Sequence, residues 1–111
     1  MQRLNEATLG GFLRERGVSA VMFGAPRGEA TMIQAVEFAD AWLDCHNDAG
    51  FGYVDAFDNV AAARDYGVRV LPTTVVFDGG EIVAWIEGRH ASGSIVQAIR
   101  ATLRAPAAVA A

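Results

Sequence analysis

The sequence predicts an α/β domain in which a central mixed β-sheet is flanked by helices, in the order βαβαβαββα. Along most of the chain, short apolar or β-branched runs alternate with segments of helical period. Near the end, Thr73 to Phe77 and Glu81 to Glu87 are predicted strands joined at Gly79-Gly80, which is typical of a hairpin turn. Because a hairpin joins antiparallel strands, the sheet is expected to be mixed.

The first elements follow from short local patterns. Met1 to Leu4 is a predicted edge strand, and Asn5 is a good cap for a helix that ends at Gly17. Val18 to Phe23 is an apolar strand that we expect to be buried on both faces. A loop over Gly24 to Ala30 follows it.

The next segment, Met32 to Asp48, has a clear helical period. One broad apolar arc of this helix is expected to face the core, and it holds Met32, Val36, Phe38, Ala39, Trp42, Leu43 and Cys45. Another side carries an acidic stripe of Glu37, Asp40, Asp44 and Asp48. The stripe belongs to a longer stretch between Arg27 and Arg64 that contains seven acidic residues and neither lysine nor arginine. Such a stripe is either a solvated helix face or a docking face for a basic partner.

The second half of the domain repeats the alternation. Gly50 to Val54 is a predicted strand, and Asp58 is the expected cap of a short helix that runs to Tyr66. Ser92 is the expected cap of the last helix, whose inward-facing residues are Ile95, Val96, Ile99 and Leu103. We therefore predict one domain over residues 1–104, followed by a flexible alanine-rich tail over 105–111.

Composition excludes several classes of function. The net charge of −4 argues against nucleic acid as the main partner, and the absence of lysine excludes a catalytic lysine. No apolar run reaches the length of a membrane span, and Met1-Gln2-Arg3 does not begin a secretory signal, so a cytoplasmic protein is expected. The single cysteine, Cys45, rules out a disulfide within the chain and fits a reducing compartment.

One stretch resembles a known family. The segment Tyr66-Gly67-Val68-Arg69-Val70-Leu71-Pro72-Thr73, with Phe77 and Gly80-Glu81 after it, is similar to the cis-proline loop and last hairpin of thioredoxins. The resemblance implies a thioredoxin fold over nearly the whole chain. It also implies that Pro72 is cis and faces the loop that carries the active-site cysteines in that family.

The residues that perform dithiol chemistry in thioredoxins are missing here. With one residue deleted, the two active-site cysteines of the family fall at or near Arg27 and Ala30, and Met22 takes the place of its buried aspartate. What remains of the family's site is a peptide-binding groove without electron transfer. By the resemblance, its walls are Pro26, Arg27, Gly28 and Glu29, then Val70, Leu71 and Pro72, and finally Glu87, Gly88 and Arg89.

The remaining polar residues indicate no cofactor and no metal. Cys45 lies far along its helix and is expected to be a buried structural thiol. Cys45-His46-Asn47-Asp48 contains metal-ligand residue types, but consecutive helical positions point in different directions and cannot converge on one ion. No dinucleotide, phosphate-loop or serine-nucleophile motif is present.

Thioredoxin-like chains without the cysteine pair resemble one bacterial group, the HyaE/HupG-type hydrogenase accessory proteins. The shared features are the missing Cys-x-x-Cys and the retained proline loop, followed by Val76-Phe77 and Gly79-Gly80. This resemblance implies a non-enzymatic chaperone in [NiFe] hydrogenase maturation. Its partner would be the hydrogenase small-subunit precursor with its twin-arginine signal peptide. Two alternatives remain open, namely an interaction module of another pathway and a redox protein that uses Cys45 alone or with a partner thiol.

Overall fold

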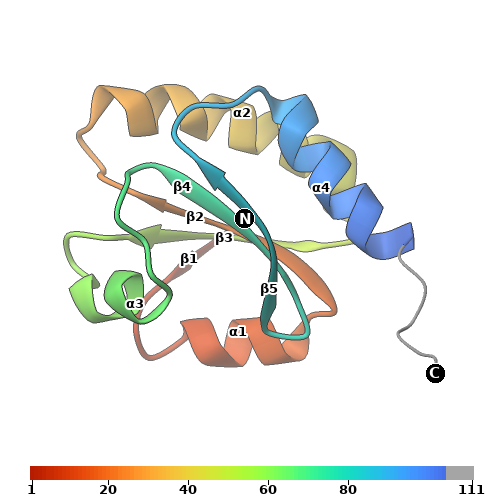
Figure 1. The fold of residues 1–111 in the computed structure, drawn as a ribbon, viewed down its shortest axis with the longest axis horizontal. Coiled ribbons are helices and arrows are strands. Elements are labelled where there is room, and N and C mark those ends of the chain that lie inside the picture. The colour runs from red at the N-terminus through yellow and green to blue at the C-terminus, as the bar shows by residue number, and fades with distance from the viewer. Residues whose placement is uncertain (105–111) are drawn as a thin grey trace.

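The computed structural model describes residues 1–104, so the predicted tail over 105–111 lies outside the described residues. Figure 1 shows the elements in the predicted order. They are β1 (Gln2–Leu4), α1 (Leu9–Glu15), β2 (Val18–Gly24), α2 (Glu29–Cys45), β3 (Gly50–Asp55), α3 (Val60–Asp65), β4 (Thr73–Asp78), β5 (Glu81–Glu87) and α4 (Ser92–Arg104).

A five-stranded sheet with the strand order β1-β3-β2-β4-β5 forms the centre of the molecule. The strands β1, β3 and β2 are parallel, whereas β4 is antiparallel to β2, and β5 is antiparallel to β4. The predicted mixed sheet with an antiparallel final hairpin is therefore confirmed. Gly79 and Gly80 both have positive φ, at 60° and 92°, which explains why glycines occupy this turn.

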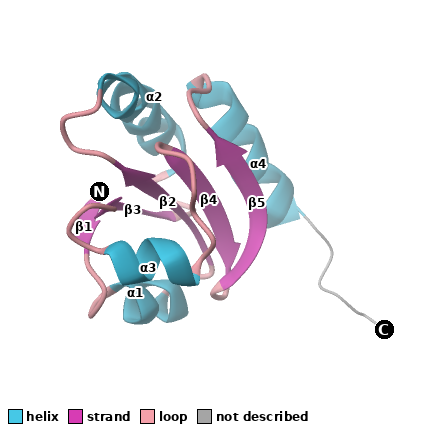
Figure 2. Ribbon diagram, turned by 60° about the vertical axis from the view of Figure 1, so that its left-hand side comes forward, coloured by secondary structure: helices cyan, strands magenta, loops and turns pink. Residues whose placement is uncertain are grey.

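Helices cover both faces of the sheet, α2 and α4 on one side and α1 and α3 on the other (Figures 1 and 2). Each face has its own core. Met22 and Phe38 belong to the core beneath α2 and α4, and Phe23 and Phe77 belong to the core beneath α1 and α3. All seven residues of β2 are buried, as expected for a central strand whose side chains alternate between the two cores.

The helix starts differ from the predicted caps. Helix α1 begins at Leu9, and Asn5 caps the turn that leads into it: Asn5 Oδ1 accepts the N–H groups of Ala7 and Thr8, and the Asn5 carbonyl accepts the N–H of Leu9 at 2.9 Å. Asp58 does not cap α3: Asn59 precedes that helix, and its side-chain amide donates to the carbonyl of Asp55 instead.

Helix α4 also lacks the predicted serine cap. It begins at Ser92 itself, and Glu37 Oε1 on α2 accepts the Ser92 N–H at 2.8 Å. A carboxylate from a neighbouring helix thus satisfies an N–H group at the positive end of α4.

The expected inner face of α2 is wrong in part. Phe38 and Cys45 are buried as predicted, but Met32, Val36 and Leu43 are 60%, 61% and 64% exposed. The residues that α2 buries are Thr31, Gln34, Phe38, Ala41 and Cys45. Apolar residues surround most of this helix, so the pattern alone does not say which side packs on the sheet.

Candidate functional site

The loops predicted to form a groove meet at one end of the sheet. Phe23, next to the end of β2, pairs with Thr73 at the start of β4, and Thr73 pairs with Glu87 at the end of β5. The segments after β2, before β4 and after β5 therefore lie at the same edge. The connection from β3 to α3 joins them, because Ala56 N–H donates to the carbonyl of Gly24 at 2.9 Å.

The proline loop lies in the middle of this edge. The Leu71–Pro72 peptide bond is cis, and Pro72 is buried while Val70 is 43% exposed. The Pro72 carbonyl accepts the N–H of Gly88 at 2.8 Å, and Gly88 has a φ of 76° that favours glycine. Val70, Leu71, Pro72 and Gly88, which the family resemblance places along the groove, thus lie close together.

The loop between β2 and α2 turns tightly onto its helix. Thr31 Oγ1 accepts the N–H of Ala25 at 3.0 Å, and a Cβ added to Gly24 would lie 2.5 Å from Thr31 Cγ2. This close approach explains why a glycine ends the strand. Pro26 and Arg27 are exposed at the tip of the loop, and Gly28 and Glu29 lead into the first turn of α2.

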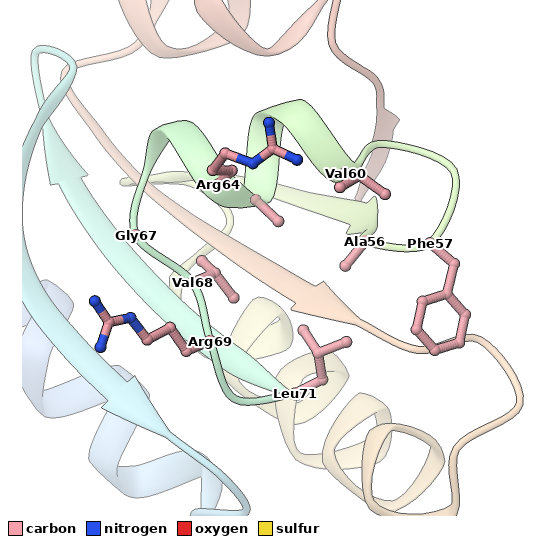
Figure 3. Close-up of a pocket in the computed structure, with 9 residues that line it drawn as sticks. Ala56, Phe57, Val60, Arg64, Gly67, Val68, Arg69 and Leu71 are labelled. Carbon is pink, nitrogen blue, oxygen red and sulfur yellow. The ribbon is translucent and has the colours of Figure 1, made fainter.

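Beside the proline loop lies a pocket of about 510 Å³ between α3 and the chain from Gly67 to Leu71 (Figure 3). Its lining is mostly apolar, and its two charged residues are both arginines. The lining residues are Ala56, Phe57, Val60, Ala63, Arg64, Gly67, Val68, Arg69 and Leu71. Leu71 therefore belongs to both the loop and the pocket.

Sequence reasoning missed Phe57, which lines this pocket although its side chain is 68% exposed. An exposed phenylalanine offers apolar surface that is costly to leave in water. The available signal was its position in a loop between Asp55 and Asp58, where a large apolar residue has no core to join.

The predicted acidic residues lie together on one side of α2, away from the groove loops, but they differ in exposure. Glu37, predicted to be an exposed docking residue, is instead half-buried, and its Oε1 accepts the Ser92 N–H at the start of α4. Asp40 and Asp44 are exposed on α2, well past its first turn. Arg89 is exposed on the segment after β5.

Gln34, which the sequence did not single out, anchors that segment. Its side chain is fully buried, and Gln34 Oε1 accepts the N–H of His90 at 2.7 Å. The His90 ring lies 2.9 Å from the carbonyl of Glu87, which further orders the turn. Helix α2 therefore positions one wall of the groove.

No thiol lies at the groove. Neither Arg27 nor Ala30, at or near which the resemblance places the family's cysteines, carries a thiol, and Met22 is a buried apolar side chain. Cys45 is 2% exposed at the far end of α2, and burial raises the pKa of its thiol.

Among residues 1–104, no cluster of three or more histidine, cysteine or carboxylate side chains is arranged to hold a metal ion. Within the same residues, no helix is both long and apolar enough to cross a membrane.

Comparison with solved structures identifies the architecture as a thioredoxin fold. Fasciola hepatica thioredoxin superposes with a TM-score of 0.82 at 24% identity, over 92% of this chain and 99% of that one. Chloroplastic thioredoxin z gives a TM-score of 0.84 at 16% identity, over 95% and 96% of the two chains. Malassezia sympodialis thioredoxin gives 0.79 at 19% identity, over 92% and 90%. At these identities the likeness establishes the fold alone.

The sequence comparisons do not assign the chain to a protein family. No protein-family model matches the chain. Error-prone DNA polymerases of Bordetella parapertussis and Bordetella bronchiseptica are 32% identical over 69 residues, a match that covers 53% of this chain and 7% of each polymerase. The chain thus corresponds to a small fraction of those proteins, and their activity carries no argument here.

Proposed function

We propose that this protein is a non-redox thioredoxin-fold accessory protein that binds an extended segment of a client protein. The observation that carries the proposal is the juxtaposition of the Leu71–Pro72 loop, the Gly88 turn and the apolar pocket of Phe57, at an end of the sheet that holds no cysteine. Peptide recognition at such an edge uses backbone pairing for affinity and side-chain pockets for selectivity.

The lining of the pocket suggests which part of a client it receives. Its wall is apolar, and its charged residues, Arg64 and Arg69, are both exposed. A large apolar side chain with neutral or acidic neighbours fits this lining best, because a basic neighbour would meet like charge. Basic residues of the same client would instead be attracted to Asp40 and Asp44.

A finer form of the proposal concerns the client. The resemblance to HyaE/HupG-type accessory proteins favours the hydrogenase small-subunit precursor, whose signal peptide carries paired arginines. Two alternatives compete with it: a thioredoxin-like interaction module of another pathway, and a redox protein that uses Cys45 alone. The burial of Cys45 disfavours the redox alternative.

The test is binding of that precursor, with and without its signal peptide, to wild-type protein and to Phe57→Ser. Because Phe57 is largely exposed, its replacement should leave the fold intact while lowering affinity about tenfold. Ile82→Ser is the matched control, since Ile82 is 45% exposed on β5 and does not line the pocket. Unchanged binding by Phe57→Ser would reject the pocket as the client site.

The same experiment distinguishes peptide binding at the groove from the identification of the client as the hydrogenase small-subunit precursor. Loss of binding on removal of the signal peptide is expected if the signal is the bound segment. If the precursor fails to bind wild-type protein at all, the hydrogenase assignment is wrong and the interaction module of another pathway becomes the better description.

A further inference from the structure

The outer side of α2 carries an apolar stripe that packs against nothing in the described part of the chain. Met32, Val36 and Leu43 are each about three-fifths exposed, and Figures 1 and 2 show no element over the side of α2 that faces away from the sheet. At about 100° per residue, the stripe lies roughly 150° around the helix from Phe38 and Cys45, which face the core. It is therefore not the edge of the buried face but a second apolar face.

At its N-terminal end, the stripe leads into an apolar pocket of about 320 Å³. Met32 belongs to both the stripe and the pocket, and all three methionines of the chain line the pocket. The lining residues are Met1, Met22, Pro26, Thr31, Met32, Ala35, Phe38 and Tyr53. Methionine side chains are flexible and polarizable, so a pocket lined with them adapts to apolar side chains of different shapes.

One flank of the stripe is acidic. Asp40 and Asp44 are exposed and lie about 60 to 100° around the helix from the middle of the stripe. Glu29 is exposed at the start of the same helix, and α2 contains no arginine or lysine. A second copy of this chain docked stripe to stripe would bring these carboxylates together. Charge complementarity therefore selects a basic partner.

The backbone of α2 indicates the form of that partner. The groups in the middle of an α-helix are already hydrogen-bonded within it, so this surface offers no edge to an extended peptide. A partner that lies here must satisfy its own backbone groups, as a helix does. The stripe covers twelve residues from Met32 to Leu43, a length of about 16 Å, which matches about three turns of a packed helix.

We propose that the outer face of α2 docks an amphipathic helix of a partner protein. One apolar side chain of that helix enters the methionine-lined pocket, others cover Val36 and Leu43, and basic residues on one flank face Asp40 and Asp44. This surface lies along α2, whereas the groove lies at the loop end of the sheet, and Pro26 borders both. The inference goes beyond the proposed groove binding and does not depend on it.

The probe is a synthetic amphipathic helical peptide with a leucine stripe flanked on one side by arginines. Binding is followed by NMR on protein labelled with ¹³C at the methionine methyl groups, because all three methionines line the pocket. We expect the Met22 and Met32 methyl signals to shift on titration and the affinity to fall as salt is added. A matched peptide with glutamate in place of arginine should bind at least tenfold more weakly.

Two surface variants and one control complete the test. Val36→Asp should weaken binding of the arginine peptide about tenfold, because it places a charge in the apolar contact. Asp40→Arg with Asp44→Arg should also weaken it about tenfold and remove its salt dependence. Val70→Ser, an exposed change in the groove, should leave this affinity unaltered.

Three outcomes would overturn the proposal. The first is equal affinity for the arginine and glutamate peptides. The second is binding that leaves the Met22 and Met32 methyl signals in place. The third is co-sedimentation of the protein alone with phosphatidylcholine–phosphatidylglycerol vesicles, lost in Val36→Asp, which would assign the stripe to a lipid surface.

Discussion

Cys45 is the only thiol, and its surroundings keep it protonated. Burial is the largest cause that raises its pKa, and the charges of Asp44 and Asp48 raise it further, while Arg100 opposes them. Because the thiolate is the reactive form, we expect native protein to react slowly with Ellman's reagent near neutral pH and quickly after unfolding. Fast reaction of the native thiol would show that Cys45 is accessible and would reopen the single-cysteine redox alternative.

The raised pKa of Cys45 also has a consequence for stability. The unfolded thiol ionises at its ordinary pKa, whereas the folded thiol holds its proton to higher pH. The stabilising contribution is therefore complete below the ordinary thiol pKa and is lost as the pH rises toward the folded value. Urea denaturation at a series of alkaline pH values should show a steeper loss of stability in wild-type protein than in Cys45→Ala. Parallel losses in the two proteins would contradict this.

Helix α2 acts as a clamp on the connection between β5 and α4. Gln34 Oε1 accepts a hydrogen bond from the N–H of His90, and Glu37 Oε1 accepts one from the N–H of Ser92. Gln34→Ala should lower the free energy of unfolding by about 1 kcal/mol, because it removes the acceptor of the partly buried His90 N–H group. Gln97→Ala is the control, since Gln97 is exposed on α4.

Thermal denaturation measures this effect, and hydrogen exchange locates it. Amide protection should fall at His90 in Gln34→Ala and at Ser92 in Glu37→Ala, because each substitution removes one of the two acceptors. If Gln34→Ala unfolds like wild type and His90 keeps its protection, the clamp contributes nothing to the position of the groove wall.

The same helix shows why sequence patterns locate an element better than they orient it. The period of α2 was evident, and burial of Phe38 and Cys45 was predicted correctly. Met32, Val36 and Leu43 were placed on the same inner arc but lie outside. Polar Thr31 and Gln34 take inner positions, where Thr31 Oγ1 and Gln34 Oε1 accept the N–H groups of Ala25 and His90, and these hydrogen bonds offset part of the cost of burial. His90 is 56 residues from Gln34 in sequence, so no local pattern contains that partner.

Across the whole molecule, the order of elements and the mixed sheet followed from alternating periodicities and the glycine hairpin. The convergence of Val70, Leu71 and Pro72 with Gly88 was expected from the family resemblance, and the strand register accounts for it. The pocket of Phe57 could not be predicted, because it depends on how α3 packs beside the proline loop. The partial burial of Glu37 against the start of α4 likewise depends on where α4 begins.

The final prediction concerns dithiol–disulfide exchange and the loop over Gly24 to Ala30, where the resemblance places the cysteine pair of thioredoxins. Exchange between dithiols and disulfides within one protein needs an attacking and a resolving thiol, and this chain has only Cys45. Wild-type protein should therefore not accelerate dithiothreitol-driven reduction of insulin.

The double variant Arg27→Cys with Ala30→Cys should gain that activity. Arg27 is exposed at the loop tip, and Ala30 lies in the first turn of α2, where the positive end of the helix dipole lowers the pKa of a thiol. Arg27→Ser with Ala30→Ser is the matched control without thiols. Insulin reduction by wild-type protein that disappears in Cys45→Ser would contradict the non-redox assignment. An inactive double cysteine variant would mean that the loop no longer holds the geometry that the thioredoxin fold implies.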